Sequence, residues 1–237
     1  MAQLDFDDFD VLTFDCYGTL IDWEAGLLEA FRAPLEAHGI HEGGDDLLGA
    51  FARHEAELEA GPYRRYREVL GGVLTTMLSH FGQVPSAEEV AAFGGSVASW
   101  PAFPDSEPAL ATLHSRFKLG VITNCDDDLF AASEARLGIS FDWVITAQQA
   151  KRYKPNPRGF ELAFERIGLP PSRILHVAQS LYHDHVTAKR LGLSTVWVDR
   201  RHGRPDGGAT PPAEATPDLI VPDMAALAAL AALAVPS

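Results

Sequence analysis

Short runs of apolar residues recur along the chain and are typical of buried β-strands. They span residues 10–15, 119–123, 143–146, 174–178, 195–198 and 218–221. Between the later runs, apolar residues follow the spacing of a helix, as at 159–167 and 186–191. Strands that alternate with helices predict βαβ units, and therefore an α/β fold with a doubly wound parallel sheet.

A different pattern fills the stretch from residue 23 to about residue 100. Its apolar positions recur at helical spacing, for example at 27, 28, 31 and 35, and again at 69, 73, 74 and 77. The pairs Gly43-Gly44 and Gly61-Pro62 interrupt the pattern, so several successive helices are predicted. We therefore expect an α/β core domain of residues 1–22 and 101–237, with a helical cap domain of residues 23–100 inserted after the first strand. Glycines and prolines at 201–217 predict an irregular loop.

Charge and composition narrow the class of protein. The 237 residues carry 19 Lys and Arg against 33 Asp and Glu, a formal net charge of −14. Nucleic-acid binding needs clustered basic residues, so a nucleic-acid partner is not expected. The acidic N-terminal segment does not resemble a signal peptide, and the longest apolar run, at 224–235, is shorter than the roughly 20 residues of a membrane span. We expect a cytoplasmic protein that has no membrane partner.

Polar residues follow four of the predicted strands. These places are Asp15, Thr123-Asn124, the stretch from Lys151 to Lys154, and the stretch from Gln179 to Asp184. In doubly wound sheets, ligands bind beyond the carboxyl ends of the strands, near the point where the strand order reverses. The four places are therefore candidates for one common site.

The same four places resemble the sequence motifs of the haloacid dehalogenase superfamily. The resemblance rests on residues 14–20 (FDCYGTL), 122–124 (ITN), 153–157 (YKPNP) and the acidic loop that ends at Asp184. Within the superfamily, the chain is similar to the (S)-2-haloacid dehalogenases of type II. Residues 12–24, 100–105 and 180–185 resemble the L-azetidine-2-carboxylate hydrolases of that branch. The resemblance implies a covalent aspartyl intermediate and a homodimer.

Asp15 ends the first predicted strand. A carboxylate at a strand end is often only part of a turn, and the residue alone leaves that alternative open. The resemblance implies that Asp15 is the nucleophile, whose attack on carbon forms an ester and divides one difficult substitution into two easier steps. The neighbouring Cys16 points to the opposite side of the strand and is interpreted as a core thiol.

Two positions separate the reaction classes of the superfamily. Tyr17, with an ordinary pKa of about 10, stands where the phosphatases have a second aspartate that protonates the leaving group. Gln179 stands where they have a further carboxylate for Mg²⁺, so that only Asp184 remains there. We therefore expect no metal and no other cofactor. A halide leaves without a proton, which is compatible with Tyr17.

Lys154 precedes Pro155 just beyond a predicted strand. A single loop lysine is usually solvated, and Lys151 is a rival, but the resemblance favours Lys154 between the carboxylates of Asp15 and Asp184. A cation there keeps both carboxylates ionised. Thr19 and Thr123 would donate hydrogen bonds to Asp15, the alternative being structural caps. The expected catalytic residues are Asp15, Thr19, Thr123, Lys154 and Asp184.

Five residues are candidates for binding the substrate: Tyr17, Arg53, Asn124, Gln179 and Ser180. Tyr17 has packing as its alternative role. Asn124, with backbone N–H groups at a helix start, suits a substrate carboxylate. The resemblance implies that Arg53 guides the carboxylate or the leaving group, with Arg64, Arg65 and Arg67 as rivals. His183 and His185 are interpreted as supporting groups.

Two departures from the dehalogenase pattern concern the leaving group. Leu181 stands where that branch has an asparagine, and Phe160 stands where it has a tyrosine. The sequence predicts a hydrolase of short 2-substituted carboxylic acids, with (S)-2-haloacid dehalogenation favoured. Ring opening of L-azetidine-2-carboxylate is the close rival, in which Tyr182 or His183 would give the amine its proton. A Mg²⁺-dependent phosphatase and a catalytically silent binding module are the remaining alternatives.

Overall fold

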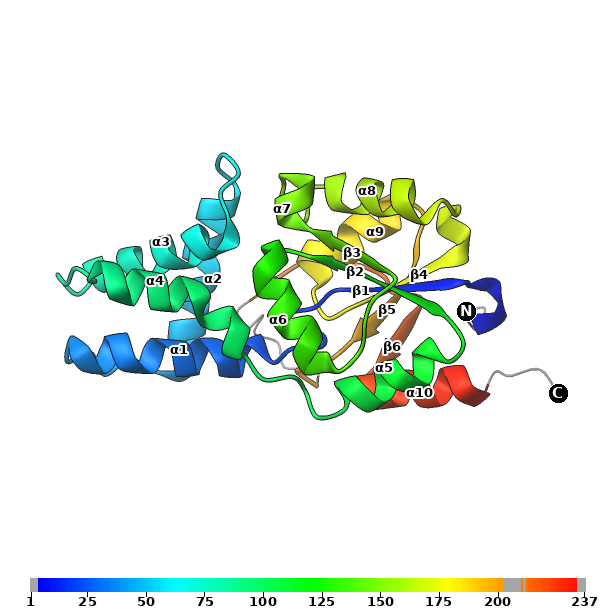
Figure 1. Ribbon diagram of the computed structural model, residues 1–237, viewed down its shortest axis with the longest axis horizontal. Helices are drawn as coiled ribbons and strands as arrows, with labels where there is room; N and C mark the ends of the chain where they lie inside the picture. Colours follow the sequence, from blue (N-terminus) through cyan, green and yellow to red (C-terminus); the bar gives the residue numbers. More distant parts are fainter. Residues whose placement is uncertain (1–3, 203–209, 211, 234–237) are drawn as a thin grey trace.

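A six-stranded parallel sheet forms the centre of the molecule (Figure 1). The computed structural model describes residues 4–202, 210 and 212–233, so most of the predicted loop at 201–217 lies outside the described residues. The strand order is β3-β2-β1-β4-β5-β6. The strands are β1 (Val11–Phe14), β2 (Lys118–Thr123), β3 (Trp143–Thr146), β4 (Ile174–Ala178), β5 (Ser194–Val198) and β6 (Leu219–Val221). This confirms the predicted α/β fold and its six strands.

The strand order reverses beside β1. The chain proceeds from β1 outward to β2 and β3 on one side, and then returns to place β4 on the other side of β1. Phe14 is paired with Val121 of β2 and with Val177 of β4. The residues that follow β1, β2 and β4 therefore meet at the switch point where ligands bind in such sheets.

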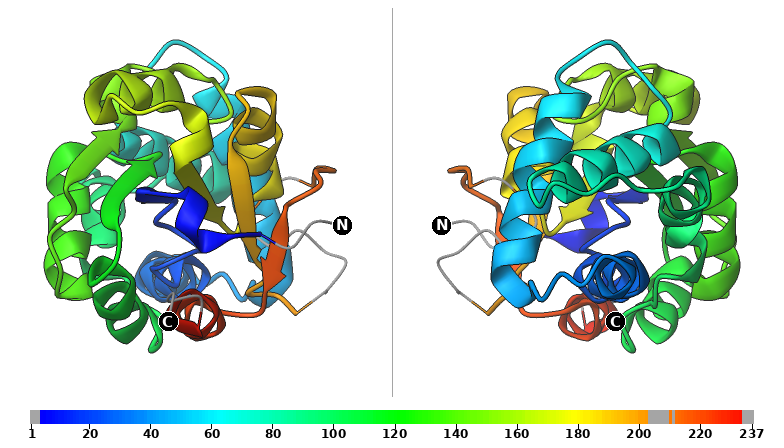
Figure 2. Two further views of the ribbon diagram at one scale, coloured as in Figure 1. Left: turned by 90° about the vertical axis from the view of Figure 1, so that its right-hand side faces the viewer. Right: turned by 90° about the vertical axis from the view of Figure 1, so that its left-hand side faces the viewer.

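Helices cover both faces of the sheet (Figures 1 and 2). Alternate strand residues divide between two apolar clusters, because successive side chains point to opposite faces. One face packs against α5 (Ser106–His114), α6 (Asp127–Leu137) and α10 (Met224–Leu233). The other packs against α8 (Arg158–Ile167) and α9 (Val186–Arg190), and the short α7 (Ala147–Ala150) precedes α8.

A helical insertion follows β1 and lies beyond the carboxyl ends of the strands (Figure 1). It consists of α1 (Trp23–Ala37), α2 (Gly44–Glu59), α3 (Tyr66–Ser79), α4 (Ala87–Gly95) and a short 3₁₀ turn, η2 (Ser96–Ser99). The breaks predicted at Gly43-Gly44 and Gly61-Pro62 fall at the start of α2 and between α2 and α3. The division into a core domain and a cap domain at residues 23 and 100 stays a prediction.

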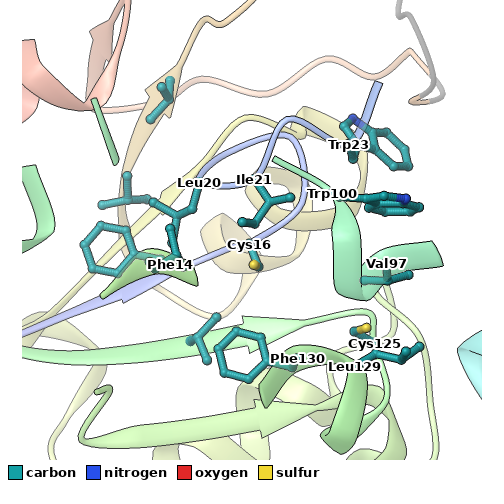
Figure 3. Close-up of a cluster of buried hydrophobic side chains, with 14 of the residues drawn as sticks. Phe14, Cys16, Leu20, Ile21, Trp23, Val97, Trp100, Cys125, Leu129 and Phe130 are labelled. Atoms are coloured by element: carbon teal, nitrogen blue, oxygen red, sulfur yellow. The ribbon is translucent and has the colours of Figure 1, made fainter. Parts of the chain in front are cut away.

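The insertion and the sheet share one apolar cluster, part of which surrounds the turn after β1 (Figure 3). Trp100 is 1% exposed and packs edge to face against Tyr17, with ring centroids 5.6 Å apart. Cys16 and Cys125 are both buried and free, which confirms Cys16 as a core thiol. Burial raises the pKa of Cys16 well above its usual value and that of Cys125 to about 12, so neither is a ready nucleophile.

Three hydrogen bonds connect the core to the start of α3 and to Arg64, just before it. The Asp126 carboxylate, just after β2, accepts hydrogen bonds from the backbone N–H groups of Tyr66 (2.9 Å) and Arg67 (3.2 Å). The Tyr153 hydroxyl donates to the carbonyl of Arg64 at 2.8 Å. Asp126 of the core therefore satisfies N–H groups that a helix start leaves without partners, in addition to the local bond from the Arg65 backbone N–H to the Glu68 carboxylate at 2.9 Å. None of the helices in the described part of the chain is long and apolar enough to cross a membrane.

Candidate active site

Asp15 lies directly beyond β1 and is 6% exposed. Each of its carboxylate oxygens has a donor: the Thr19 hydroxyl is 2.7 Å from Oδ2, and the Lys154 ammonium is 2.8 Å from Oδ1. Its backbone N–H donates to the carbonyl of Val177 on β4 at 3.0 Å. The carboxylate is therefore held in one orientation by groups from three segments of the chain.

The tight turn after Asp15 brings Thr19 back to it. Gly18 takes a φ of +89°, which glycine adopts without strain, and the carbonyl of Cys16 accepts the N–H of Leu20 at 2.7 Å. Besides donating to Asp15, the Thr19 hydroxyl accepts the backbone N–H of Gln179 at 2.9 Å. With one bond donated and one accepted, the direction of the hydroxyl proton toward Asp15 is fixed.

Lys154 joins the two carboxylates, as the resemblance predicts. Its ammonium donates to Asp15 Oδ1 (2.8 Å), to Asp184 Oδ1 (2.7 Å) and to the carbonyl of Ile122 (2.8 Å). These three acceptors use its three protons. Burial lowers the pKa of Lys154, but the two carboxylates outweigh that effect and raise it above its usual value. The side chain is therefore a permanent cation.

Asp184 lies in a π-helical turn, η4 (Leu181–His185), after β4 and is fully buried. Its Oδ1 contacts His176 Nε2 at 3.1 Å, and His176 Nδ1 contacts the hydroxyl of Thr13 at 2.9 Å. Burial raises the pKa of Asp184, but Lys154 and His176 more than offset it, so the pKa lies below its usual value. Its Oδ2 has no hydrogen-bond partner among the described residues.

The pKa of Asp15 moves in the other direction. Burial raises the pKa of Asp15 above its usual value. The ammonium of Lys154 lowers it, the charge of Asp184 raises it, and the hydrogen bond from Thr19 lowers it, with a net rise.

Phe160 does not supply the hydroxyl that the dehalogenase pattern places at its position. Its buried ring packs edge to face on His176, with centroids 4.9 Å apart, behind the carboxylates.

The expected hydrogen bond from Thr123 to Asp15 is absent, which corrects the prediction. The Thr123 hydroxyl is buried without a partner among the described residues. The reason is register: because Phe14 pairs with Val121, Asp15 is level with Ile122, and Thr123 lies one residue further, on the alternate face. It is Ile122 that contributes, through its carbonyl bond to Lys154.

The predicted substrate-binding residues take different positions. Asn124 lines the cavity above Asp15, but its amide also donates to and accepts from the backbone of Lys154, at 3.1 and 2.6 Å. Ser180 lines the cavity and accepts the backbone N–H of His183 at 2.9 Å. Tyr17 lines it as well, with its hydroxyl 3.0 Å from that of Ser133.

Gln179 and Arg53 do not line this cavity. The side chain of Gln179 packs against the turn at Gly18, where an added Cβ atom would stand 3.2 Å from its Oε1. Arg53 is exposed on α2, where the resemblance implied contact with the substrate. It is two residues from Glu55, which does line the cavity, and positions two apart on a helix face opposite ways.

The cavity itself has a volume of about 30 Å³. From the core it is lined by Asp15, Tyr17, Asn124, Lys154, Ser180, His183, Asp184 and Thr210, and from the insertion by Trp23, Glu55, Glu59 and Tyr66. Sequence reasoning missed all four residues of the insertion. The signal for Glu55 was a carboxylate on the apolar face of a helix, between Phe51 and Leu58.

Glu55 is 4% exposed, and its Oε1 accepts the hydroxyl proton of Tyr66 at 2.7 Å. Burial raises the pKa of Glu55 to about 8, although Tyr66 opposes the shift. Burial, followed by the charge of Glu55, raises the pKa of Glu59 well above its usual value. A groove of about 410 Å³ adjoins the cavity and shares Glu59, Lys154 and His183 with it.

The side chains at this site do not fit a magnesium ion. Mg²⁺ requires near-octahedral oxygen ligands. Here both oxygens of Asp15 already have donors, the Gln179 side chain packs on Gly18, and the Tyr17 hydroxyl contacts Ser133. Across the described ranges, 4–202, 210 and 212–233, no group of three His, Cys, Asp or Glu could hold a metal ion.

Comparisons with known proteins show which family the chain resembles. A family model described as haloacid dehalogenase-like hydrolase matches residues 9–192. The chain is 23% identical over 202 residues to (S)-2-haloacid dehalogenase 1 of Pseudomonas sp. (strain CBS-3), covering 82% of this chain and 86% of that protein. It is 27% identical over 206 residues to validoxylamine A 7'-phosphate phosphatase of Streptomyces hygroscopicus subsp. limoneus, covering 82% and 87%.

Among solved structures, the L-2-haloacid dehalogenase of Xanthobacter autotrophicus has a similar fold. The TM-score is 0.79 at 22% identity, and the match covers 94% of this chain and 98% of that one.

Proposed function

The chain belongs to the haloacid dehalogenase-like hydrolase family, and we propose that it hydrolyses short 2-substituted carboxylic acids through an ester on Asp15. One observation carries the proposal: a buried carboxylate has a donor on each oxygen, a permanent cation beside it, and a second carboxylate across that cation. This arrangement suits a nucleophile that attacks carbon without a metal. The relatives' names favour (S)-2-haloalkanoates as substrates.

In the first step, one oxygen of Asp15 attacks C2 of the substrate from the side opposite the leaving group. The O–C2 bond forms, the bond to the leaving group breaks, and the leaving group takes the electron pair, with inversion at C2. A halide departs as its anion and needs no proton. Lys154 and Thr19 hold the attacking carboxylate in place, so that less freedom is lost in reaching the transition state.

In the second step, water attacks the carbonyl carbon of the Asp15 ester and releases a 2-hydroxy acid. Whichever oxygen of Asp15 carries the substrate, the other retains a donor, Thr19 or Lys154, for the developing negative charge. The Asp184 Oδ2, which has no partner in the described chain, is available to orient the attacking water. The depressed pKa of Asp184 keeps it ionised for this role.

Ring opening of L-azetidine-2-carboxylate is the second candidate, and the carboxyl groups of Glu55 and Glu59 favour it because they suit a nitrogen better than a halide. The two proton sources predicted for it do not suit the role. His183 faces the cavity, but burial lowers its pKa to about 4, so it is neutral near pH 7. Tyr182 packs on the His183 ring and does not line the cavity.

A single turnover in ¹⁸O-labelled water tests the covalent step. With enzyme in excess over (S)-2-chloropropionate or L-azetidine-2-carboxylate, we expect one ¹⁸O atom in the peptide that contains Asp15 and none in the product. The Asp15→Asn variant should show neither turnover nor label. Label in the product alone would contradict the ester. Hydrolysis of p-nitrophenyl phosphate that requires Mg²⁺ and exceeds turnover of both acids would identify a phosphatase instead.

A further inference from the structure

Arg200 lies two residues beyond β5 and donates two hydrogen bonds to the turn that follows β1. Its Nε and Nη2 atoms lie 3.2 and 2.9 Å from the carbonyl oxygen of Thr19. Thr19 is fully buried, and within the described chain no other group donates to this carbonyl. A buried carbonyl without a donor is costly, so the guanidinium of Arg200 is what allows the turn to bury it.

The guanidinium of Arg200 is itself held in one position. Its Nη1 atom donates to both carboxylate oxygens of Asp105, at 2.9 Å each, and its central carbon lies 4.0 Å from the centroid of the Phe103 ring. Asp105 in turn accepts the backbone N–H of Met224, the first residue of α10, at 2.7 Å. The Arg200 side chain is only 10% exposed. Because a guanidinium is planar and its donor directions are fixed, these contacts determine where it meets Thr19.

Thr19 connects this guanidinium to the candidate nucleophile. Its hydroxyl donates to Asp15 Oδ2 at 2.7 Å, and its carbonyl is the acceptor of Arg200. The hydroxyl and the carbonyl belong to one residue, so a shift of the carbonyl also displaces the hydroxyl. A displacement of about 1 Å in a group that orients a reaction can lower its rate by about 100-fold. Loss of the Arg200 contact should therefore reach Asp15 through Thr19.

We propose that Arg200 is a positioning residue: by holding the carbonyl of Thr19, it aims the Thr19 hydroxyl at the carboxylate of Asp15. This inference rests on the proposed function, which takes Asp15 as the nucleophile. Arg200 does not line the cavity, so it does not act by binding the substrate. The alternative is a purely structural role, in which Arg200 only stabilises the segments that it joins.

A double-mutant cycle of Arg200→Met and Thr19→Ala separates the two roles. Steady-state kinetics is measured on whichever of (S)-2-chloropropionate and L-azetidine-2-carboxylate is turned over faster. In the native sequence, Arg200→Met should lower kcat at least about tenfold and change KM by less than about threefold, because the contact orients the nucleophile and not the substrate. In the Thr19→Ala background, which keeps the carbonyl but lacks the hydroxyl, it should lower kcat by less than about twofold further. An equal fold-loss in both backgrounds would overturn the proposal.

Arg200→Lys provides a second measurement, which also applies if Arg200→Met does not fold. An ammonium keeps the charge opposite Asp105 but lacks the planar fork that reaches Asp105 and Thr19 at once, so kcat should still fall about tenfold. The hydrogen bond from Thr19 lowers the pKa of Asp15, so the acid limb of kcat/KM should move to higher pH in this variant. A native kcat, or a reduced kcat with an unmoved acid limb, would contradict the proposal.

Arg173→Met is the matched control. Arg173 donates to Asp10, directly before β1, and so forms an arginine–aspartate pair at the opposite end of the same strand from Asp15. Its loss should leave kcat within about twofold of the native value. Circular dichroism of each variant establishes that it folds. A loss of kcat in Arg173→Met equal to that in Arg200→Met would show that removal of any such pair suffices, and would overturn the proposal.

The two proposals fail in different ways. If the effects of Arg200→Met and Thr19→Ala on kcat depend on each other but no ¹⁸O enters Asp15, positioning of Thr19 by Arg200 stands and the ester is wrong. If Asp15 is labelled while the two effects are independent, the ester stands and Arg200 is not a positioning residue.

Discussion

The two sides of the cavity differ in how completely their charges are satisfied. On the core side, Asp15, Lys154 and Asp184 form a closed set of hydrogen bonds that also includes Thr19 and the carbonyl of Ile122. On the side of the insertion, Glu55 has one neutral donor and Glu59 has none in the described chain. The comparison separates two environments: the ends of the strands provide a balanced set of charges, and the helices bring in carboxyl groups whose raised pKa values favour the protonated, uncharged form.

Removal of the central cation should produce the largest effect. In Lys154→Met, two buried carboxylates lose their common partner, and we expect the free energy of unfolding to fall by about 3–5 kcal/mol. Turnover should fall by at least about 100-fold, because the ester also loses a donor. Urea denaturation and steady-state kinetics measure these effects.

Lys151→Met is the control for that change. Lys151 is exposed, and its ammonium lies 5.2 Å from the ring centroid of Tyr63, so its loss should cost less than about 1 kcal/mol. If Lys151→Met lowered the free energy of unfolding as much as Lys154→Met, the buried hydrogen bonds of Lys154 would not explain the loss of stability.

The pH dependence of stability should reveal the uncompensated carboxyl on the other side. The folded pKa of Glu55, about 8, lies above its ordinary value of 4.5, so between these values the folded protein binds the extra proton. Its contribution to stability is therefore complete below about pH 4.5 and is lost as the pH rises through 8. The loss amounts to a few kcal/mol, since a tenfold difference in proton affinity between the folded and unfolded chain corresponds to about 1.4 kcal/mol.

The measurement is the free energy of unfolding from pH 5 to pH 8.5 for the native sequence, Glu55→Gln and Glu57→Gln. Glu55→Gln should make the decline shallower, with the part due to Glu59 remaining, whereas Glu57→Gln should retain it in full. A decline that survives Glu55→Gln unchanged would place its origin elsewhere.

Loss of the hydrogen bonds between Asp126 and the start of α3 should produce the smallest effect on stability. Asp126→Ala removes the acceptor of two N–H groups at the start of α3 and should cost about 1–2 kcal/mol. Since α3 carries Tyr66, KM should rise more than kcat falls. Asp128→Ala, which removes an exposed partner of Arg67, should change stability by less than about 1 kcal/mol. Equal effects of the two would contradict the role given to Asp126.

The sequence predicts the core side of the cavity far better than the side of the insertion. Asp15, Lys154 and Asp184 each follow a strand, and the carboxyl ends of parallel strands meet at one edge, so local pattern places them together. Thr123 fails because its orientation depends on the register between β1 and β2, which no local pattern specifies. Tyr66 is missed because its position depends on the contact of Asp126 with α3, a contact between segments 60 residues apart. Glu55 has a local signal, its place on the apolar face of α2, but its position in the cavity depends on how the insertion packs against the sheet.

The hydrogen bonds of Lys154 also determine the stage of folding at which the candidate active site forms. Its three acceptors come from the end of β1, from β2 and from the turn after β4, and Asp15 is 139 residues away in sequence. In a nascent chain, or one in which these strands have not yet paired, Asp15, the proposed nucleophile, is an ordinary solvated aspartate. Hydrolytic activity therefore arises only when the centre of the sheet is complete. Its recovery during refolding reports that β1, β2 and β4 have paired.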